Sequence, residues 1–290
     1  MRSAPLIRSG IFTAGAAALL AVLLVQVGPA QQGKAKGAKA AAKKAAIPPG
    51  DWPLYSRDLA SDRFSPLNQI NTTNVAQLKQ AWTYRPQAPP PPPDNEKGGG
   101  KGKGKGGAGG IGGEVTPIVV NGVMYVPAGS RVMALDAESG KQIWTYTAPG
   151  AVGNRAVGYW PGEGSNPPRV LFTAGTKMMA LNANTGAIDP GFGKEGTVDI
   201  GITWGGAPYV YKNLVILGNN NGESTDGPAG NTKVYDARTG SKLWDFNTIA
   251  QPGDPGHETW LNDGWKKRAG VNTWGWYFTV DEDRDLIYMP

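Results

Sequence analysis

The sequence predicts an all-β protein of the β-propeller class, on three observations. Gly and Pro supply 43 and 24 of the 290 residues, which disfavours long helices because both destabilise helix interiors. Ten Trp residues indicate a packed core rather than a wholly disordered chain. A strand–turn–strand pattern occurs three times at intervals of about 50 residues, the length of one propeller blade.

Each repeat follows a short apolar run, so we expect it to form the outer two strands of a four-stranded antiparallel blade. The turn glycines of the three copies are 46 and 54 residues apart. The copies are VMALDAESGKQIWTY (132–146), MMALNANTGAIDPGFG (178–193) and KVYDARTGSKLWDF (233–246), with turn glycines Gly140, Gly186 and Gly240.

The turns of the repeats have a consistent chemistry. An Asp or Asn side chain can accept hydrogen bonds from turn amides, and the following Gly supplies a positive φ. Trp144 and Trp244 on the returning strands are predicted to fill the gap between neighbouring sheets, whereas the middle copy has Pro190 in that place. The Asp and Asn residues are Asp136, Asn182 and Asp236.

The first 30 residues are predicted to be a signal peptide. Arg2 and Arg8 precede an apolar stretch at 11–27, and Gly28-Pro29-Ala30 offers small residues for cleavage. The apolar stretch is shorter than the roughly 20 residues of a membrane span, so we expect export to the periplasm. Retention as a membrane anchor is the alternative.

Two low-complexity segments flank the first part of the predicted fold. Residues 31–50 are an Ala/Lys linker, and residues 86–110 are a Pro-rich and then Gly/Lys-rich insert. The remainder of 51–290 has room for three to four blades. The last residues, DLIYMP (285–290), are typical of the middle of a further blade, so we expect this chain to be a fragment of a longer protein.

Composition excludes several functional classes. The chain has no Cys, which excludes a disulfide framework, a Cys-ligated metal and a thiol nucleophile. His257 is the only His, which excludes a multi-histidine metal site, and we expect it to be exposed in its Pro/Gly loop. The net charge of +6 comes from the leader and the Lys-rich segments, so no nucleic-acid partner is indicated.

The residues outside these segments resemble the pyrroloquinoline quinone (PQQ) dependent dehydrogenases. The similarity covers DWPLYSRDLASDRFSPLNQINTTNVAQLKQAWTYR (51–85), EVTPIVVNGVMYV (114–126), NRAVGYW (154–160), the three repeats, and the final stretch 258–290. The resemblance implies the N-terminal part of an eight-bladed propeller that binds PQQ in a central funnel beside a calcium ion.

The resemblance also implies roles for individual residues. Arg155 corresponds to an arginine that holds the cofactor, and Trp274 to a tryptophan that stacks under the quinone. Glu223, in a G-x-x-x-x-E pattern, corresponds to a calcium-ligating glutamate. The other implied cofactor contacts are Glu114, Thr173, Asn220 and Asn221. Each also has an ordinary structural explanation, namely a solvated Glu or Asn, a surface ion pair, a strand Thr or an inter-blade Trp.

The implied function is the oxidation of an alcohol or sugar hydroxyl, with electrons passed to cytochrome c or ubiquinone. The catalytic aspartate of the family would lie beyond Pro290, so no catalytic residue is expected in this chain. The stretch 147–154 lacks the adjacent cysteines of the methanol- and ethanol-oxidising members. The rival hypothesis is a non-catalytic propeller that acts as a binding or assembly scaffold. A nucleotide-dependent dehydrogenase is disfavoured because no G-x-G-x-x-G opens a helix after a strand.

Overall fold

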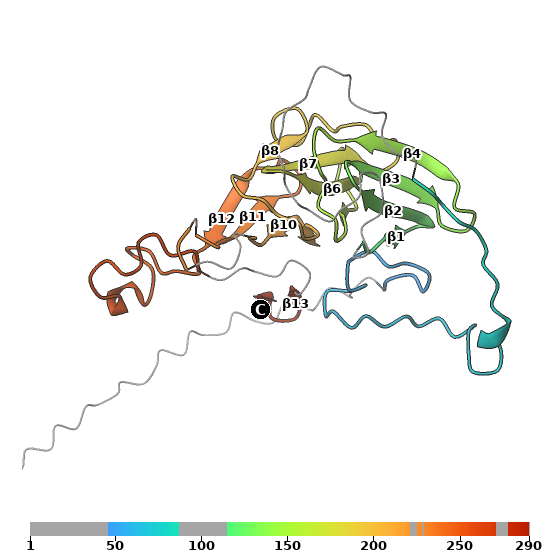
Figure 1. Cartoon of the computed structure of the whole chain (residues 1–290), viewed down its shortest axis with the longest axis horizontal. Coiled ribbons are helices and arrows are strands. Elements are labelled where there is room, and N and C mark those ends of the chain that lie inside the picture. Colours follow the sequence, from blue (N-terminus) through green and yellow to red (C-terminus); the bar gives the residue numbers. More distant parts are fainter. Residues whose placement is uncertain (1–45, 87–114, 221–224, 228, 271–277, 290) are drawn as a thin grey trace, which may run out of the picture. The chain divides into compact units, whose positions relative to one another are not determined.

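The computed structural model describes residues 46–86, 115–220, 225–227, 229–270 and 278–289 (Figure 1). The predicted signal peptide and nearly all of the predicted linker and insert lie outside these residues. Within the described residues, none of the helices is long and apolar enough to cross a membrane. The only helical elements among them are the short 3-10 helices η1 (Val75–Gln77) and η2 (His257–Thr259).

In the described part of the chain, strands build three four-stranded sheets and one two-stranded sheet, and each of these sheets is antiparallel with its strands in chain order. Blade 1 contains β1 (Ile118–Val120), β2 (Val123–Ala128), β3 (Arg131–Asp136) and β4 (Gln142–Thr147). Blade 2 contains β5 (Gly158–Trp160), β6 (Arg169–Ala174), β7 (Lys177–Asn182) and β8 (Thr197–Asp199). Blade 3 contains β9 (Tyr209–Tyr211), β10 (Leu214–Leu217), β11 (Thr232–Asp236) and β12 (Lys242–Phe246). The two-stranded sheet pairs β13 (Thr279–Asp281) with β14 (Leu286–Tyr288).

These sheets confirm the predicted propeller blades, and the first and third repeats form outer strands as expected. The middle repeat departs from the prediction. Its first half is β7, but the outer strand β8 begins at Thr197, after the repeat has ended. Within the repeat, Ile188 makes only an isolated bridge to Leu181. Pro190 explains the difference, because proline has no N–H to donate to a strand ladder.

The turn chemistry of the repeats is confirmed. Asp136 Oδ1 accepts the N–H of Ser139 at 2.8 Å, and Asp236 Oδ1 accepts the N–H of Arg238 at 2.7 Å. Asn182 makes the corresponding bond in the middle copy. The three turn glycines have φ values of 69°, 71° and 75°, a region that favours glycine.

Trp144 joins blade 1 to blade 2. Its indole N–H donates to the carbonyl oxygen of Ala183 at 2.9 Å, and only 8% of the residue is exposed. A Cβ atom at Gly186 would lie 2.6 Å from the Trp144 ring, so the turn needs glycine for this contact as well as for its φ. The prediction that Trp144 fills the gap between sheets is therefore confirmed.

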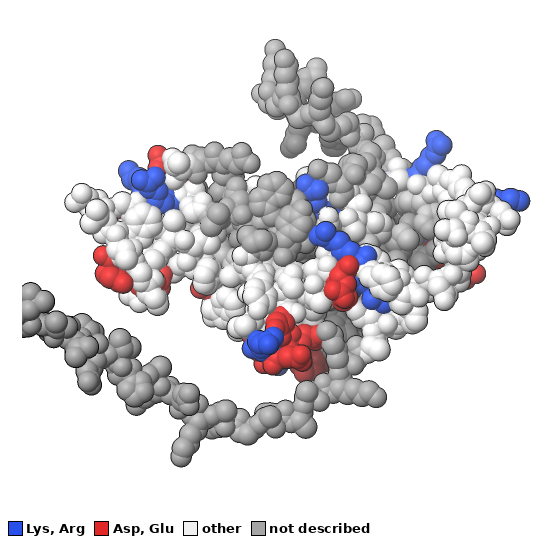
Figure 2. Space-filling view, turned by 90° about the horizontal axis from the view of Figure 1, so that it is seen from below, with Lys and Arg blue, Asp and Glu red and all other residues white. Residues whose placement is uncertain are grey.

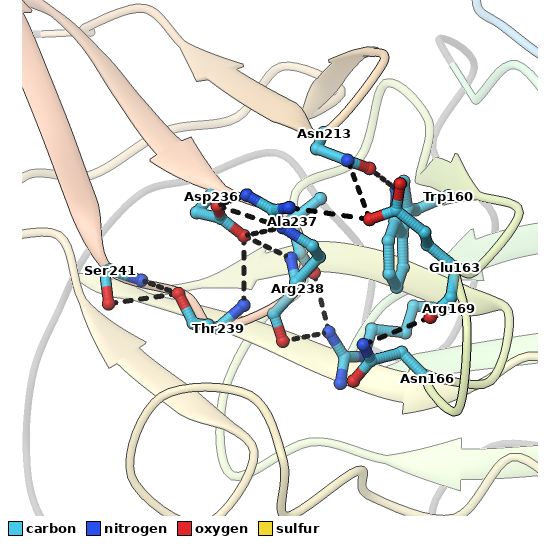
Figure 3. A network of polar contacts seen from close by, with 10 residues as sticks. All are labelled: Trp160, Glu163, Asn166, Arg169, Asn213, Asp236, Ala237, Arg238, Thr239 and Ser241. Atoms are coloured by element: carbon cyan, nitrogen blue, oxygen red, sulfur yellow. Dashed lines mark hydrogen bonds and ion pairs between the residues drawn. The ribbon is translucent and has the colours of Figure 1, made fainter.

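Between blades 2 and 3, where the repeat has no Trp, Arg169 supplies the hydrogen bond to the turn (Figure 3), whereas Val198 and Gly193 lie over the turn glycine Gly240. Its Nη1 donates to the carbonyl oxygens of Ala237 and Arg238, both at 2.6 Å, and its Nε donates to Asp189 Oδ2 at 2.7 Å. Ala237 follows Asp236 as Ala183 follows Asn182 in blade 2. A guanidinium group thus replaces the indole N–H at the same turn carbonyl. The rings that flank this guanidinium are those of Trp160 and Phe192.

The prediction for Trp244 is wrong within the described residues. Trp244 lies on β12 as expected, but it is 41% exposed instead of filling a gap between sheets. The neighbouring β13–β14 sheet has only two strands, so no described third strand and turn lie over the indole.

The N-terminal segment connects inner strands that are far apart in the sequence. Trp52 bridges to Val119 of β1, and the Leu59 carbonyl accepts the N–H of Val280 of β13 at 2.8 Å. The same carbonyl accepts the hydroxyl of Tyr209 at 3.1 Å. Burial, and next the carboxylates of Asp58 and Glu282, raise the pKa of Tyr209 above its ordinary value.

Candidate functional site

The predicted site residues that the structure describes lie at one end of the blades. In an antiparallel meander, the connection before the first strand and the turn between the second and third strands are at the same end. Arg155 lies between β4 and β5, Thr173 is in the last part of β6, and Asn220 follows β10. We call this end the rim, and define it by the connections before β5 and β9 and the segments after β6 and β10.

Backbone hydrogen bonds fix the loop that carries Arg155. The Arg155 carbonyl accepts the N–H of Thr116 at 2.8 Å. Two residues earlier, Gly153 donates its N–H to the Thr173 carbonyl, also at 2.8 Å. Because blade 1 and blade 2 both hold this loop, the half-buried Arg155 side chain starts from a fixed backbone position at the rim.

Thr173 is buried, and its hydroxyl already donates a hydrogen bond within the protein. The residue is 1% exposed, and Oγ1 donates to the Trp204 carbonyl at 2.6 Å. A Cβ atom at Gly153 would lie 2.8 Å from the same Oγ1, so the three residues are closely packed. A hydroxyl has one proton to donate, so a cofactor carboxylate would have to compete with Trp204 for it. The predicted contact between Thr173 and the cofactor stays a prediction.

We expect Thr173→Val to lower the free energy of unfolding by about 1–3 kcal/mol, because the buried Trp204 carbonyl loses its donor. Thr145→Val is the matched control, since Thr145 is exposed on β4. Urea unfolding of both variants measures the effect. Equal stability of Thr173→Val and wild type would show that the Thr173–Trp204 hydrogen bond contributes nothing to the fold.

Two further groups at the rim were missed by the sequence analysis. Asn219 is 1% exposed and donates through Nδ2 to the Ala229 carbonyl, but its Oδ1 has no hydrogen-bond partner among the described residues. Within the part of the chain that the structure describes, the indole N–H of the buried Trp204 also has no partner. Asn220 is exposed, and its carbonyl accepts the hydroxyl of Thr203 at 3.5 Å.

An internal repeat could have identified Trp204. The tripeptide Thr-Trp-Gly occurs at 203–205 and again at 273–275. Trp204 precedes β9 by five residues, and Trp274 precedes β13 by the same interval. The two Trp residues therefore have equivalent positions in the sequence, each five residues before the first strand of a sheet. No comparable signal distinguishes Asn219 from the two Asn residues that follow it.

Four predicted site residues lie outside the described residues: Glu114, Asn221, Glu223 and Trp274. Phe278, close to Trp274 in sequence, is fully buried and packs against Trp204 and Tyr209, with ring centroids 6.5 and 5.7 Å apart. The described part of the chain contains no group of three or more His, Asp or Glu residues that could hold a metal ion.

His257 is half-buried in η2 instead of fully exposed as predicted. Its Nδ1 lies 3.0 Å from the Ala250 carbonyl, and its ring packs edge-on against Trp265. These contacts give the side chain a structural role in its loop. On the face drawn in Figure 2, the described basic side chains are scattered among acidic ones.

Successive four-stranded antiparallel blades, joined through their repeat turns and carrying polar residues on one rim, define this chain as part of a β-propeller with a candidate binding site at that rim. The family described as glucose/ethanol/alcohol dehydrogenase, beta-propeller domain, under the short name PQQ, matches residues 52–290. The chain belongs to this family.

Curated relatives agree with this assignment. The chain is 31% identical over 278 residues to the dehydrogenase subunit of the quinone alcohol dehydrogenase of Gluconobacter oxydans, covering 83% of this chain and 32% of the relative. It is 32% identical over 273 residues to methanol dehydrogenase [cytochrome c] subunit 1 of Methylobacterium organophilum, covering 82% of this chain and 39% of the relative. The chain thus spans about a third of the length of these relatives.

A solved structure shows the same architecture. The quinohemoprotein alcohol dehydrogenase of Comamonas testosteroni aligns with a TM-score of 0.63 at 30% identity, over 85% of this chain and 36% of that chain. The predicted fold class and family are therefore confirmed, and the open sheets match a partial propeller.

Proposed function

We propose that this chain is the cofactor-binding N-terminal part of a periplasmic quinoprotein dehydrogenase that oxidises an alcohol or sugar hydroxyl with PQQ and calcium. The observation that carries the proposal is the gathering of Arg155 and Asn220 at one rim of a propeller of the PQQ family. Electrons would pass to cytochrome c or ubiquinone. One relative is named as a cytochrome c linked methanol dehydrogenase, which supports this kind of acceptor.

The described rim residues fit a flat, polyanionic cofactor. PQQ has three carboxylates, and the planar guanidinium of Arg155 can donate two parallel hydrogen bonds to one of them. The exposed Asn220 offers an amide at the neighbouring blade. The unpaired Trp204 N–H and Asn219 Oδ1 give the same rim a buried donor and a buried acceptor without partners. Such groups are costly to leave unpaired, which supports the presence of a bound polar molecule or ordered water.

Glu223 is the proposed metal ligand. Calcium prefers hard oxygen ligands, and a loop carboxylate that follows β10 supplies one. A relative from Methylacidiphilum fumariolicum is named as a lanthanide-dependent methanol dehydrogenase, so both kinds of ion belong in the test. When bound, PQQ supplies the two-electron acceptor and the metal ion polarises its carbonyl.

The side chains present in this chain suggest a separate role for each proposed site residue. Arg155, Asn220, Asn221 and Glu114 would bind and orient the cofactor, and Trp274 would support one of its faces. The base that takes the substrate proton is proposed to lie beyond Pro290, in the part of the family that this chain does not cover. This chain alone is therefore proposed to bind PQQ poorly and to turn over no substrate.

Two substitutions in the protein that contains all blades distinguish a loss of metal binding from a loss of stacking on PQQ. They are Glu223→Gln and Trp274→Ala. We expect Glu223→Gln to lower activity at low calcium and to recover in part with excess Ca²⁺. We expect Trp274→Ala to weaken PQQ binding several-fold, about 1 kcal/mol beyond the buried area, without full rescue by calcium. The measurement is PQQ-reconstituted dye reduction, titrated with Ca²⁺ and with a lanthanide ion.

Glu138→Gln is the matched control, because Glu138 is exposed in the turn between β3 and β4, at the end opposite the rim. A wild-type calcium response of Glu223→Gln would contradict the metal assignment. A lower melting temperature of Trp274→Ala at unchanged PQQ affinity would make that Trp a packing residue. If the complete protein binds no PQQ, the scaffold hypothesis replaces the dehydrogenase.

A further inference from the structure

A loop of the N-terminal segment contacts the first strands of two neighbouring sheets. We call residues 56–63 the support loop. The Leu59 carbonyl accepts the hydroxyl of Tyr209 on β9 at 3.1 Å and the N–H of Val280 on β13 at 2.8 Å. A carbonyl oxygen has two lone pairs, so it can hold both donors at once. The support loop therefore joins blade 3 to the two-stranded sheet.

Ser61 holds the residues at the start of β13. Its Oγ donates to the Phe278 carbonyl at 3.0 Å and accepts the hydroxyl of Thr279 at 3.3 Å. Arg57, Ser61 and Arg63 have φ values of 74°, 62° and 53°, in the left-handed region that residues other than glycine seldom adopt. Such strained residues persist where surrounding contacts hold them, and they are frequent at functional sites. The support loop is therefore held in a defined conformation against β13.

A series of buried contacts leads from Phe278 to the rim. The Phe278 and Trp204 ring centroids are 6.5 Å apart, and the Trp204 carbonyl accepts the Thr173 hydroxyl at 2.6 Å. A Cβ atom at Gly153 would lie 2.8 Å from Thr173 Oγ1 and 3.3 Å from the Trp204 carbonyl oxygen. Gly153 is in the same loop as Arg155, two residues earlier. The contacts thus extend from the support loop to the loop that carries a predicted cofactor residue.

These contacts leave little space for adjustment. Phe278 is fully buried, and Trp204 and Thr173 are 4% and 1% exposed. Protein interiors are close-packed, so the displacement of one buried side chain moves its neighbours. None of the residues for which the resemblance implies a cofactor contact lies in the support loop. A change in this loop would therefore alter the rim without removing a predicted cofactor contact.

We propose that Ser61 is a positioning residue for the candidate site at the rim. Its hydroxyl fixes Phe278, which in turn holds Trp204, and the Trp204 carbonyl orients Thr173 beside the Arg155 loop. This role rests on the proposed function, because it requires that PQQ binds at the rim. Loss of the Ser61 hydroxyl should then weaken PQQ binding from outside the site.

The test replaces Ser61 by Gly in the protein that contains all blades. Glycine favours a positive φ, so Ser61→Gly removes the hydroxyl without adding backbone strain. We expect the dissociation constant of PQQ, measured by titration calorimetry, to rise about fivefold, as for the loss of one hydrogen bond. Asn121→Gly is the matched control, because Asn121 has a φ of 51° and is exposed in the turn between β1 and β2, at the end opposite the rim.

A fluorine signal tests the position of Trp204 directly and without PQQ. The protein is labelled with 5-fluorotryptophan, and the Trp204 resonance is identified by its loss in Trp204→Phe. We expect this resonance to shift in Ser61→Gly and to stay in place in Asn121→Gly. A role of Ser61 in stability alone would lower the melting temperature without moving the signal of the folded protein.

A double variant tests whether Ser61 acts through Phe278. Phe278→Leu removes the ring that contacts Trp204, so Ser61→Gly should add little to its effect on the PQQ dissociation constant. Multiplied effects in the double variant, an unchanged dissociation constant in Ser61→Gly, or an equal rise in Asn121→Gly would each overturn the inference. An unmoved Trp204 resonance would overturn it too, and this measurement needs only the single variant if the double variant does not fold. If the wild-type protein binds no PQQ, the proposed function fails, whereas the fluorine signal still shows whether Ser61 positions Trp204.

Discussion

Replacement of Arg169 by Met is expected to lower the free energy of unfolding by about 3–5 kcal/mol, because it leaves the buried Asp189 carboxylate without its ion-pair partner and the buried Ala237 carbonyl without its donor. The Arg169 side chain is 1% exposed and that of Asp189 is 10% exposed, so water cannot solvate what the substitution leaves behind. Two carbonyl oxygens of the blade 3 turn also lose their donors. Denaturant unfolding followed by Trp fluorescence measures the change.

Two further variants, Arg169→Lys and Arg284→Met, test why the free energy of unfolding falls in Arg169→Met. Lysine keeps a charge near Asp189, but it has one nitrogen and cannot bond Asp189 and the two carbonyls as Nε and Nη1 of the arginine do, so we expect a smaller yet clear loss. Arg284 pairs with Asp281 at 2.6 Å on the surface, and its replacement by Met should have little effect. A loss for Arg169→Met no larger than that for Arg284→Met would refute the idea that this guanidinium holds blades 2 and 3 together.

The role of Arg169 also shows where sequence analysis reached its limit. The repeat pattern predicted the blades, their turn chemistry and the exceptional position of Pro190, because these depend on local backbone preferences. It did not predict what replaces the missing Trp, because Arg169 precedes the repeat and meets the Ala237 carbonyl only in the folded chain. A long-range contact that replaces a local motif leaves no local signal.

At the candidate site, too, local features could be predicted from the sequence and long-range contacts could not. The structure brings Arg155 and Asn220, two residues for which the resemblance implied cofactor contacts, to the same rim, because loop positions follow from the strand order. The resemblance could not foresee that the Thr173 hydroxyl donates to Trp204, since the direction of a buried hydroxyl depends on the neighbouring blade. Trp82 lies in the N-terminal stretch that resembles the family, but the sequence predicted no contact for it. Its contact with Gly140 became evident from the packing.

Gly186→Ala is expected to be more costly than Gly175→Ala by about 1–3 kcal/mol, and the difference measures the contact between blades 1 and 2. Both glycines have positive φ values, 71° and 59°, so both substitutions impose similar backbone strain of about 1–2 kcal/mol. They also reduce the entropy of the unfolded chain by similar amounts, so these contributions cancel in the comparison. What remains is the surroundings of the added methyl group.

Those surroundings differ sharply. A Cβ at Gly175 meets nothing within 4 Å, whereas one at Gly186 would lie 2.6 Å from the Trp144 ring. The hydrogen bond from the indole N–H to Ala183 keeps that ring from moving aside. Gly186→Ala should therefore also reduce the near-ultraviolet circular dichroism of the folded protein, because the indole must tilt. Equal unfolding midpoints and unchanged spectra for the two variants would show that Trp144 moves freely, and that the blades are joined by some other contact.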